Sequence, residues 1–390
     1  MLYFDCNATV SLHPAARQAW IDTAQHNWHN PSGLYAAATR AREILEDCRE
    51  RLGSLIDCAP HRIIFTAGAT ASANMLANFI AKTIPPEVFS CLSAVEHPCV
   101  VDSFHTSMPH QVIDIPVDCT GTVSTEVLSK HLHSQAVALV SIMAASNESG
   151  VIQPWAEISE MCRHHQIPFH TDAAQWFGKM PSRGLGVCDW ISGSGHKFGG
   201  PRGIGFLVIP ENLCDFHGDR GGPQENGHHA GTENVAGIAA MLAALEAREQ
   251  EIQQQNKNWL HTRRKAEQHF EKQIPQAVIL GKDTHRLWNT IAAVIPKTQG
   301  KKIIARLDRA GIAASTGSAC SAGSDSIPRI ASAIGVEALG VKKQDLLGTV
   351  RLSSHWETTF ADWVAAIDAL SEVVNGTKRD LPSISLSDLH

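Results

Sequence analysis

The stretch WISGSGHKFGGPRGIGFLV, residues 190–208, decides the fold. Two short apolar runs flank a glycine-rich turn, and Lys197 stands in that turn directly after a histidine. Short continuous apolar runs are typical of strands that are buried on both faces of a parallel sheet. A lysine at the end of such a strand loses water, which penalises its charged form and lowers its pKa. The position therefore favours a chemical role, although a solvated lysine in a glycine-rich turn fits the spacing equally well.

The same pattern continues on both sides of this stretch. An apolar run, AVALVSIMA (136–144), precedes an amphipathic helix pattern, WAEISEMCRHHQ (155–166), and a second apolar run, IPFHTDAAQ (167–175). Alternation of strand and helix patterns predicts an α/β fold with a mainly parallel sheet and right-handed crossovers. Chemistry in such sheets collects beyond the carboxyl ends of the strands. Asn147, Asp172 and Lys197 all follow such ends.

The chain divides at a long helical segment. Residues 234–273 are polar and strongly helical, and the strand and helix patterns that follow, such as LWNTIAAVIP (287–296) and WVAAIDALSEVV (363–374), suit a smaller α/β domain. We predict a large domain over residues 14–250. Residues 1–13 and 251–390 would form the smaller domain.

The bulk composition excludes several classes of protein. The chain has 390 residues, 43% hydrophobic and 18% charged, with a formal net charge of −6, so nothing points to nucleic acid or an anionic membrane as partner. No basic segment precedes an apolar run at the N-terminus, and no run approaches the roughly 20 apolar residues of a membrane span. The ten cysteines show no C-x-x-C pairs and the histidines no helical metal spacing. We therefore expect a cytoplasmic protein with reduced thiols and no metal.

Asp172 and Lys197 suggest a cofactor. A carboxylate that keeps a pyridine nitrogen protonated and an amine that forms a Schiff base are the pair that pyridoxal phosphate requires. Gly68, Ala69 and Thr70 precede a helical pattern, where N-terminal amides and a hydroxyl can bind a phosphate, although an ordinary capped loop is the alternative. Further donors stand in SGSGHK and HAGTEN, namely Ser194, His196 and Thr232.

Nine blocks of sequence, in order from residue 3 to about residue 360, carry a resemblance to a known family. They are YFDCNAT, NPSG, EHPCVVD, NESGVIQP, HTDAAQWFGK, SGSGHKFGGPRGIG, AGTENVAGI, STGSACSAG and TVRLSS. Together they resemble the class V aminotransferase family, and specifically its NifS-like cysteine desulfurases. The resemblance implies the fold type I of pyridoxal phosphate-dependent transferases, pyridoxal 5'-phosphate as cofactor, and a homodimer.

The resemblance also implies roles for residues around the cofactor. Lys197 would hold the cofactor covalently, Asp172 would bind the pyridine nitrogen, and Gln175 would donate to the phenolic oxygen. His97 would stack on the pyridine ring and assist proton transfer. The phosphate would be bound by Ala69, Thr70, Ser194, His196 and, from the partner subunit, Thr232.

Two further residues would bind the substrate. Asn147 would lie beside the cofactor oxygen and the substrate carboxylate, and Arg351 would clamp that carboxylate with its planar guanidinium. Without the resemblance, Arg351 reads as an ordinary surface charge.

Cys320 is the candidate nucleophile. It stands in STGSACSAGSDS, where small polar residues suit an exposed loop better than a core, so a buried small hydrophobic role is the weaker alternative. In a cysteine desulfurase this thiol would take the sulfur of L-cysteine as a persulfide, release L-alanine, and pass the sulfur to an acceptor protein for iron–sulfur cluster assembly, thiamine synthesis or tRNA thiolation.

Other functions remain open at this point. Selenocysteine lyase, cysteine sulfinate desulfinase and aminotransferase activities would need Lys197 and Asp172 but not Cys320. A catalytically silent dimeric partner that keeps the fold as a binding module is a further alternative. The chain also departs from the family pattern at four positions where the family usually has an acidic residue, two arginines and a histidine: Ala71, His229, Trp356 and Tyr35, respectively. These departures bear on the substrate, the acceptor and the rate.

Overall fold

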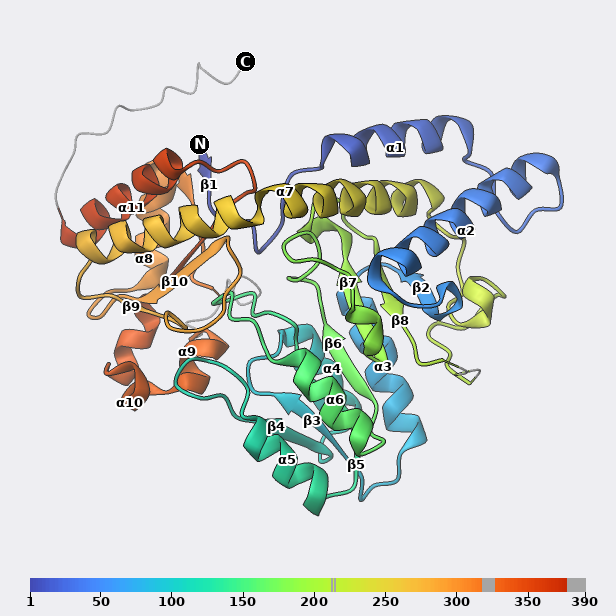
Figure 1. Cartoon of the computed structure of the whole chain (residues 1–390), viewed down its shortest axis with the longest axis horizontal. Coiled ribbons are helices and arrows are strands. Elements are labelled where there is room, and N and C mark those ends of the chain that lie inside the picture. The colour runs from blue at the N-terminus through green and yellow to red at the C-terminus, as the bar shows by residue number, and fades with distance from the viewer. Residues whose placement is uncertain (212, 214, 318–326, 377–390) are drawn as a thin grey trace.

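A central sheet organises the larger part of the molecule (Figure 1). The computed structural model describes residues 1–211, 213, 215–317 and 327–376. Within these residues the sheet has seven strands, in the spatial order β2 (Ile63–Thr66), β8 (Gly205–Val208), β7 (Trp190–Ser194), β6 (Phe169–Asp172), β5 (Val137–Ser141), β3 (Phe89–Ser93) and β4 (Val112–Ile115). The four predicted apolar runs, around residues 190–194, 205–208, 136–144 and 167–175, therefore form the adjacent strands β7, β8, β5 and β6.

The sheet is mainly parallel, which confirms the predicted fold class. Strands β7, β6, β5, β3 and β4 pair in parallel, whereas β8 runs antiparallel to both of its neighbours, β2 and β7. The connection from β7 to β8 is residues 195–204, and a parallel pairing needs a longer crossover. The glycine-rich turn around Lys197 is thus the reason that β8 reverses direction.

Helices cover both faces of this sheet. Helices α3 (Ala69–Thr83) and α4 (Pro98–Ser107) pack on one face with Leu92, Leu139 and Trp190 of the strands. Helices α2 (Ala36–Ile56), α5 (Thr125–Ser134), α6 (Trp155–His164) and the first half of α7 (Val235–Gln273) pack on the other. Strands buried on both faces explain why their sequences read as continuous apolar runs rather than alternating ones.

A second, smaller group of elements follows the long helix α7, which Figure 1 shows running past both groups. Strands β12 (Thr349–Ser353), β10 (Thr290–Val294) and β9 (Val278–Ile279) form an antiparallel sheet, and β1 (Leu2–Tyr3) pairs with β11 (Ile312–Ala313). Helix α8 (Gly300–Arg309) and helix α11 (Phe360–Asn375) pack here around Phe4 and Phe270. The exact domain boundary stays a prediction.

The remaining elements are short or peripheral. Helix α1 (Pro14–His26) lies along α7. Two short helices, α9 (Arg329–Ile334) and α10 (Val336–Leu339), come after β11 in the chain. No helix in the described part of the chain is both long and apolar enough to cross a membrane. The polar C-terminal tail, residues 377–390, lies outside the described residues.

Candidate active site

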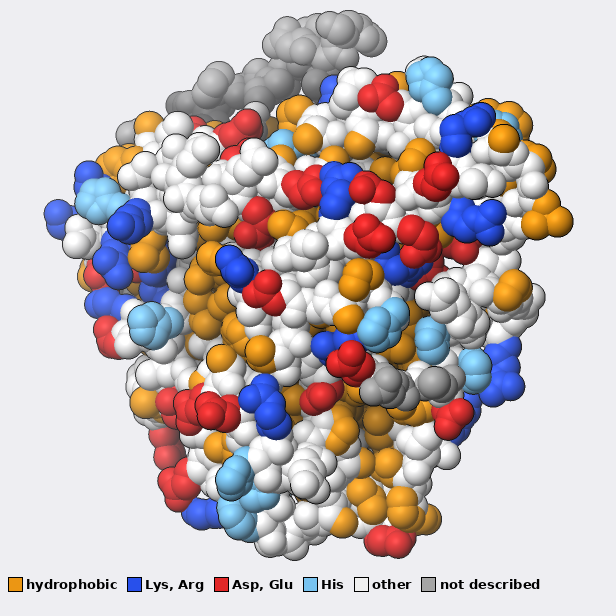
Figure 2. Space-filling model, turned by 45° about the vertical axis from the view of Figure 1, so that its right-hand side comes forward, with side chains coloured by type: hydrophobic (Ala, Val, Ile, Leu, Met, Phe, Trp, Pro, Cys, Tyr) orange, Lys and Arg blue, Asp and Glu red, His pale blue; other side chains and the backbone are white. Residues whose placement is uncertain are grey.

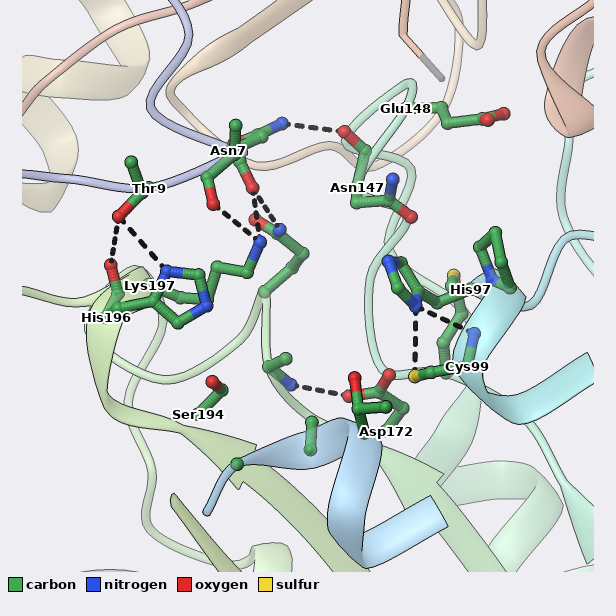
Figure 3. A pocket seen from close by; sticks show the side chains of 18 of the residues that line it. Asn7, Thr9, His97, Cys99, Asn147, Glu148, Asp172, Ser194, His196 and Lys197 are labelled. Carbon is green, nitrogen blue, oxygen red and sulfur yellow. Dashed lines mark hydrogen bonds between the residues drawn. The ribbon is translucent and has the colours of Figure 1, made fainter. Parts of the chain in front are cut away.

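Most of the predicted site residues meet in one pocket. A cavity of about 800 Å³ opens beyond the carboxyl ends of β6 and β7 (Figure 3). It is lined by Ala69, Thr70, His97, Asn147, Asp172, Gln175, Ser194, His196, Lys197 and Arg351. Thr232 does not line the pocket of its own chain and is exposed. Cys320 lies outside the described residues.

Lys197 is held by the N-terminal segment. It ends the short turn after β7, and its Nζ donates hydrogen bonds to the backbone carbonyl oxygens of Asn7 at 2.9 Å and Ala8 at 2.8 Å. These carbonyls fix the amine at the pocket wall without neutralising its charge. Asn7 lies in the YFDCNAT block but has no role predicted from the sequence; the contact joins segments 190 positions apart.

Asp172 ends β6 at the floor of the pocket. Burial raises the pKa of its carboxyl, and this effect is opposed by His97, by the N–H of Ala174, which donates to Oδ1 at 2.9 Å, and by Lys197 and Ser192. Figure 3 places it below His97 and Lys197, which stand on opposite sides of the pocket. A buried carboxylate supported by donors can hold a cationic ring nitrogen.

His97 caps helix α4 with its side chain. The backbone N–H of Cys99 donates to its Nδ1 at 3.1 Å, and the thiol of Cys99 lies 3.0 Å from the same atom. Since Nδ1 accepts the backbone N–H, the neutral ring carries its proton on Nε2. Burial lowers the pKa of His97, with Asp172 opposing and Lys197 reinforcing this effect. Cys99, which was not predicted as a site residue, also lines the pocket.

The N-terminus of α3 forms a cradle for an anion. Helix α3 begins at Ala69, its first amides have no partner one turn earlier, and no side chain in the described part of the chain caps them. Gly68 has φ of +135°, and a Cβ at Gly205 would come within 2.6 Å of the Gly68 Cα, so both positions require glycine. Ser194 stands beside this terminus, where a Cβ at Gly68 would lie 3.4 Å from its Oγ, and His196 lines the same pocket next to Thr9 (Figure 3).

His196 enters the pocket as a neutral side chain. Burial first, and then Lys197, lowers its pKa to about 4. Its Nδ1 lies 3.1 Å from the hydroxyl oxygen of Thr9. Near pH 7 the ring can therefore offer hydrogen bonding but no charge.

Arg351 reaches the pocket from β12 of the smaller group. Its NH1 donates to the carbonyl oxygens of Asn147 at 2.9 Å and Gly317 at 3.1 Å, and its NH2 forms an ion pair with Asp5. The side chain is only 1% exposed, which excludes the surface-charge alternative. Its Nε has no hydrogen-bond partner among the described residues.

Lys179 is a buried lysine with no role predicted from the sequence, although it ends the HTDAAQWFGK block. Its Nζ donates to Oε1 of Gln175, and Nε2 of Gln175 donates in turn to the Asn7 carbonyl at 2.9 Å. The contact with Lys179 therefore assigns Oε1 of Gln175 as the acceptor and Nε2 as the donor. Burial, reinforced by Lys197, lowers the pKa of Lys179 to about 7.

The four departures from the family pattern all lie outside the pocket lining, although Ala71 directly follows Thr70, which lines it, in the first turn of α3. Trp356 packs over the Arg248 guanidinium, 4.2 Å from ring centroid to Cζ, and against the ring of His355. Trp356 therefore makes a cation–π contact at a position where the family usually has an arginine. Tyr35 is 54% exposed, and the Nδ1 of His229 lies 3.8 Å from an Asp219 oxygen.

A lysine, a carboxylate and a helix N-terminus thus meet in one pocket at the carboxyl edge of a mainly parallel α/β sheet. The Aminotransferase class-V family model matches residues 2–363, and the chain belongs to this family. This confirms the family predicted from the sequence.

Similar proteins span the whole chain. A protein named cysteine desulfurase IscS from Dictyoglomus turgidum is 33% identical over 98% of this chain and 96% of its own length. A cysteine desulfurase from Cereibacter sphaeroides is 34% identical, covering 98% and 97%. Among solved structures, a NifS-like protein superimposes with a TM-score of 0.85 at 27% identity, covering 96% of this chain and 99% of that one.

Proposed function

We propose that this chain is a pyridoxal phosphate-dependent cysteine desulfurase that converts L-cysteine to L-alanine. The observation that carries the proposal is that Arg351, from the smaller group of elements, lines the same pocket as Lys197 and Asp172. One cavity thus combines groups suited to a phosphorylated pyridine aldehyde with a buried guanidinium suited to an amino acid carboxylate. The full-length relatives named cysteine desulfurase support the same reaction.

The donor set of the pocket fits pyridoxal phosphate. An uncapped helix N-terminus with Thr70 and Ser194 suits a phosphate, a buried carboxylate suits a protonated ring nitrogen, and an amine suits an aldehyde. Their placement around a single cavity matches one molecule that carries all three groups.

The residues would then act as follows. When bound to Lys197, the cofactor supplies an electron sink for the bonds of the substrate α-carbon. Asp172 keeps the ring nitrogen protonated, and Gln175, oriented by Lys179, donates toward the phenolic oxygen. His97 presents its Nε2 proton for exchange with the substrate. Ala69, Thr70, Ser194 and His196 hold the phosphate.

The other residues of the proposed site bind the amino acid substrate and react with it. Arg351 binds the α-carboxylate, beside Asn147. The thiolate of Cys320 attacks the substrate sulfur, so that an S–S bond forms as the substrate C–S bond breaks and its electron pair stays on carbon. That carbon takes up a proton and leaves as alanine, and Cys320 keeps the sulfur as a persulfide for an acceptor protein.

We further propose that the enzyme is a homodimer in which Thr232 of the partner subunit completes the phosphate site. In its own chain Thr232 is exposed and away from the pocket lining. The connection between α1 and α2 also exposes Trp28, Leu34 and Tyr35, with Leu34 98% exposed, and Figure 2 shows hydrophobic side chains at this upper right edge. Sedimentation of the purified protein tests this, because a monomer at micromolar concentration would exclude it.

The decisive experiment compares wild type with Cys320→Ser, both loaded with cofactor and given L-cysteine. A desulfurase releases alanine and sulfide with a reductant, and mass spectrometry finds a persulfide on the Cys320 peptide. In Cys320→Ser both should vanish while cofactor absorbance stays, because a serine hydroxyl is too weak a nucleophile near neutral pH. Alanine release by the variant at the wild-type rate would instead support a lyase, desulfinase or aminotransferase, which L-selenocysteine and cysteine sulfinate would distinguish. A protein without cofactor absorbance would be the silent partner.

A further inference from the structure

Four polar residues lie side by side within the central sheet, behind the pocket. In the parallel register Ser141 of β5 pairs with His170 of β6, and Asp172 of β6 pairs with Ser192 of β7. Alternate residues of a strand point to the same face, so His170 and Asp172 share a face of the sheet. Only Asp172 lines the pocket; the other three are 0% exposed.

These residues form a continuous hydrogen-bonded chain. Oγ of Ser141 lies 2.8 Å from Nδ1 of His170, and Nε2 of His170 lies 3.2 Å from Oγ of Ser192. The hydroxyl of Ser192 in turn bonds the carboxyl of Asp172. We call Ser141, His170 and Ser192 the buried relay.

The charge on Asp172 sets the direction of every bond in the buried relay. An ionised carboxylate can only accept hydrogen bonds, so Ser192 must donate its one O–H to Asp172. The Ser192 oxygen must then accept a hydrogen bond from His170. The neutral imidazole then donates from Nε2, which leaves Nδ1 to accept from Ser141. Burial lowers the pKa of His170 to about 3, so the ring stays neutral and keeps one donor and one acceptor.

We propose that His170 and Ser192 are positioning residues that keep the buried Asp172 ionised and aimed at the ring nitrogen of the cofactor. All three bonds of the relay point their donors toward the carboxylate, and aligned hydrogen bonds in a medium of low polarity strengthen one another. Removing the Ser192 hydroxyl leaves Asp172 with fewer donors in a site that already disfavours its charge. This inference rests on the proposed function, because the cofactor supplies the ring nitrogen.

The test measures cofactor binding rather than turnover. Wild type and Ser192→Ala, stripped of cofactor, are titrated with pyridoxal phosphate and with its 1-deaza analogue, in which a C–H replaces the ring nitrogen. Both compounds keep the aldehyde and the phosphate, so covalent attachment and phosphate binding cancel in the comparison. A lost hydrogen bond to a charged group should weaken pyridoxal phosphate binding about tenfold to a hundredfold relative to the analogue.

Ser90→Ala is the matched control. Ser90 is a fully buried serine on β3, its Oγ has no partner among the described residues, and it pairs with Leu139, two residues before Ser141. We expect it to leave both affinities unchanged. Equal weakening of the two compounds by Ser192→Ala, or the same selective loss in Ser90→Ala, would overturn the proposal.

A second measurement reads the direction of the relay in the wild-type protein. In wild-type protein labelled with ¹⁵N-histidine, the relay requires a neutral His170 protonated on Nε2, and the signal is assigned by its absence in His170→Gln. Protonation on Nδ1 would reverse the chain and overturn the proposal. If neither compound binds wild type, the cofactor assignment fails, and the His170 tautomer decides the direction of the relay independently.

Discussion

Arg351 and Asp5 form an ion pair at the pocket wall although 346 positions separate them in the sequence. Asp5 follows β1 and Arg351 lies in β12; the two segments meet because Asp5 forms an isolated parallel bridge to Ser353. The pair fixes one end of the guanidinium, while the carbonyl oxygens of Asn147 and Gly317 fix the other. The fork is therefore oriented before any ligand enters.

Replacing Arg351 should affect substrate binding and spare cofactor binding. Arg351→Ala removes charge-assisted hydrogen bonds to the substrate carboxylate, so KM for L-cysteine should rise by about tenfold or more. Arg351→Lys keeps the charge but loses the planar fork, so its KM should lie between those of wild type and Arg351→Ala. Steady-state kinetics with a parallel cofactor titration makes the comparison. A KM that stays at the wild-type value in Arg351→Ala would move the carboxylate site elsewhere, with His355 the next candidate.

Covalent attachment should be specific to one of the two lysines near the pocket. After borohydride reduction of the loaded enzyme, peptide mass spectrometry should find the cofactor on Lys197. Lys197→Ala should fold, as judged by circular dichroism, but retain no cofactor after reduction. Lys179→Met is the matched control and should still be labelled at Lys197. Cofactor recovered on the Lys197→Ala protein would contradict the assignment.

Asp172→Asn should separate cofactor binding from turnover. The amide keeps the shape of the side chain and can still accept from the Ala174 N–H, but it carries no charge to keep the ring nitrogen protonated. We expect the cofactor to be retained at saturating concentration, with its affinity weakened at least as much as in Ser192→Ala, and kcat to fall by about two orders of magnitude, comparable with the loss of one preorganised electrostatic contact. Single-turnover kinetics measures this, and a kcat equal to that of wild type would exclude the role.

The fold could be predicted because its signals are local. The apolar run 136–144 contains β5, and the helical segment 234–273 is α7 almost to the residue, since its polar composition and helical pattern persist over its whole length. The antiparallel β8 was not specified, because strand direction there depends on the length of the turn around Lys197. The pairing of β1 with β11 joins Leu2 to Ile312, which no local pattern encodes.

The candidate site likewise has one part that could be predicted from the sequence and one part that could not. The positions of Lys197 and Asp172 after strand ends indicated a cofactor site, and the resemblance supplied their specific roles and that of Arg351, because each stands in a recognisable block of sequence. Their partners were not predicted: the Asn7 carbonyl, Asp5 and the buried relay depend on the register between strands that are distant in the sequence. Lys179 was missed because a single lysine after a glycine has no signal of its own until its burial against Gln175 is known.

Lys179 gives a test of that burial through the pH dependence of stability. Its side chain is 4% exposed, and its pKa is lowered from 10.5 to about 7. Between about pH 7 and pH 10 the unfolded chain therefore binds more protons at this position than the folded chain, so the free energy of unfolding rises with pH in that window. Lys179→Met removes this titration.

The difference in unfolding free energy between wild type and Lys179→Met should shift in favour of wild type by roughly 2 kcal/mol from pH 7 to pH 9. Urea unfolding of the cofactor-free proteins, followed by circular dichroism at both pH values, measures this difference. Lys82→Met, at an exposed lysine of α3, is the control and should track wild type. Curves for wild type and Lys179→Met that stay parallel from pH 7 to pH 9 would mean that Lys179 keeps its proton throughout, and that the lysine beside Gln175 is charged in the working enzyme.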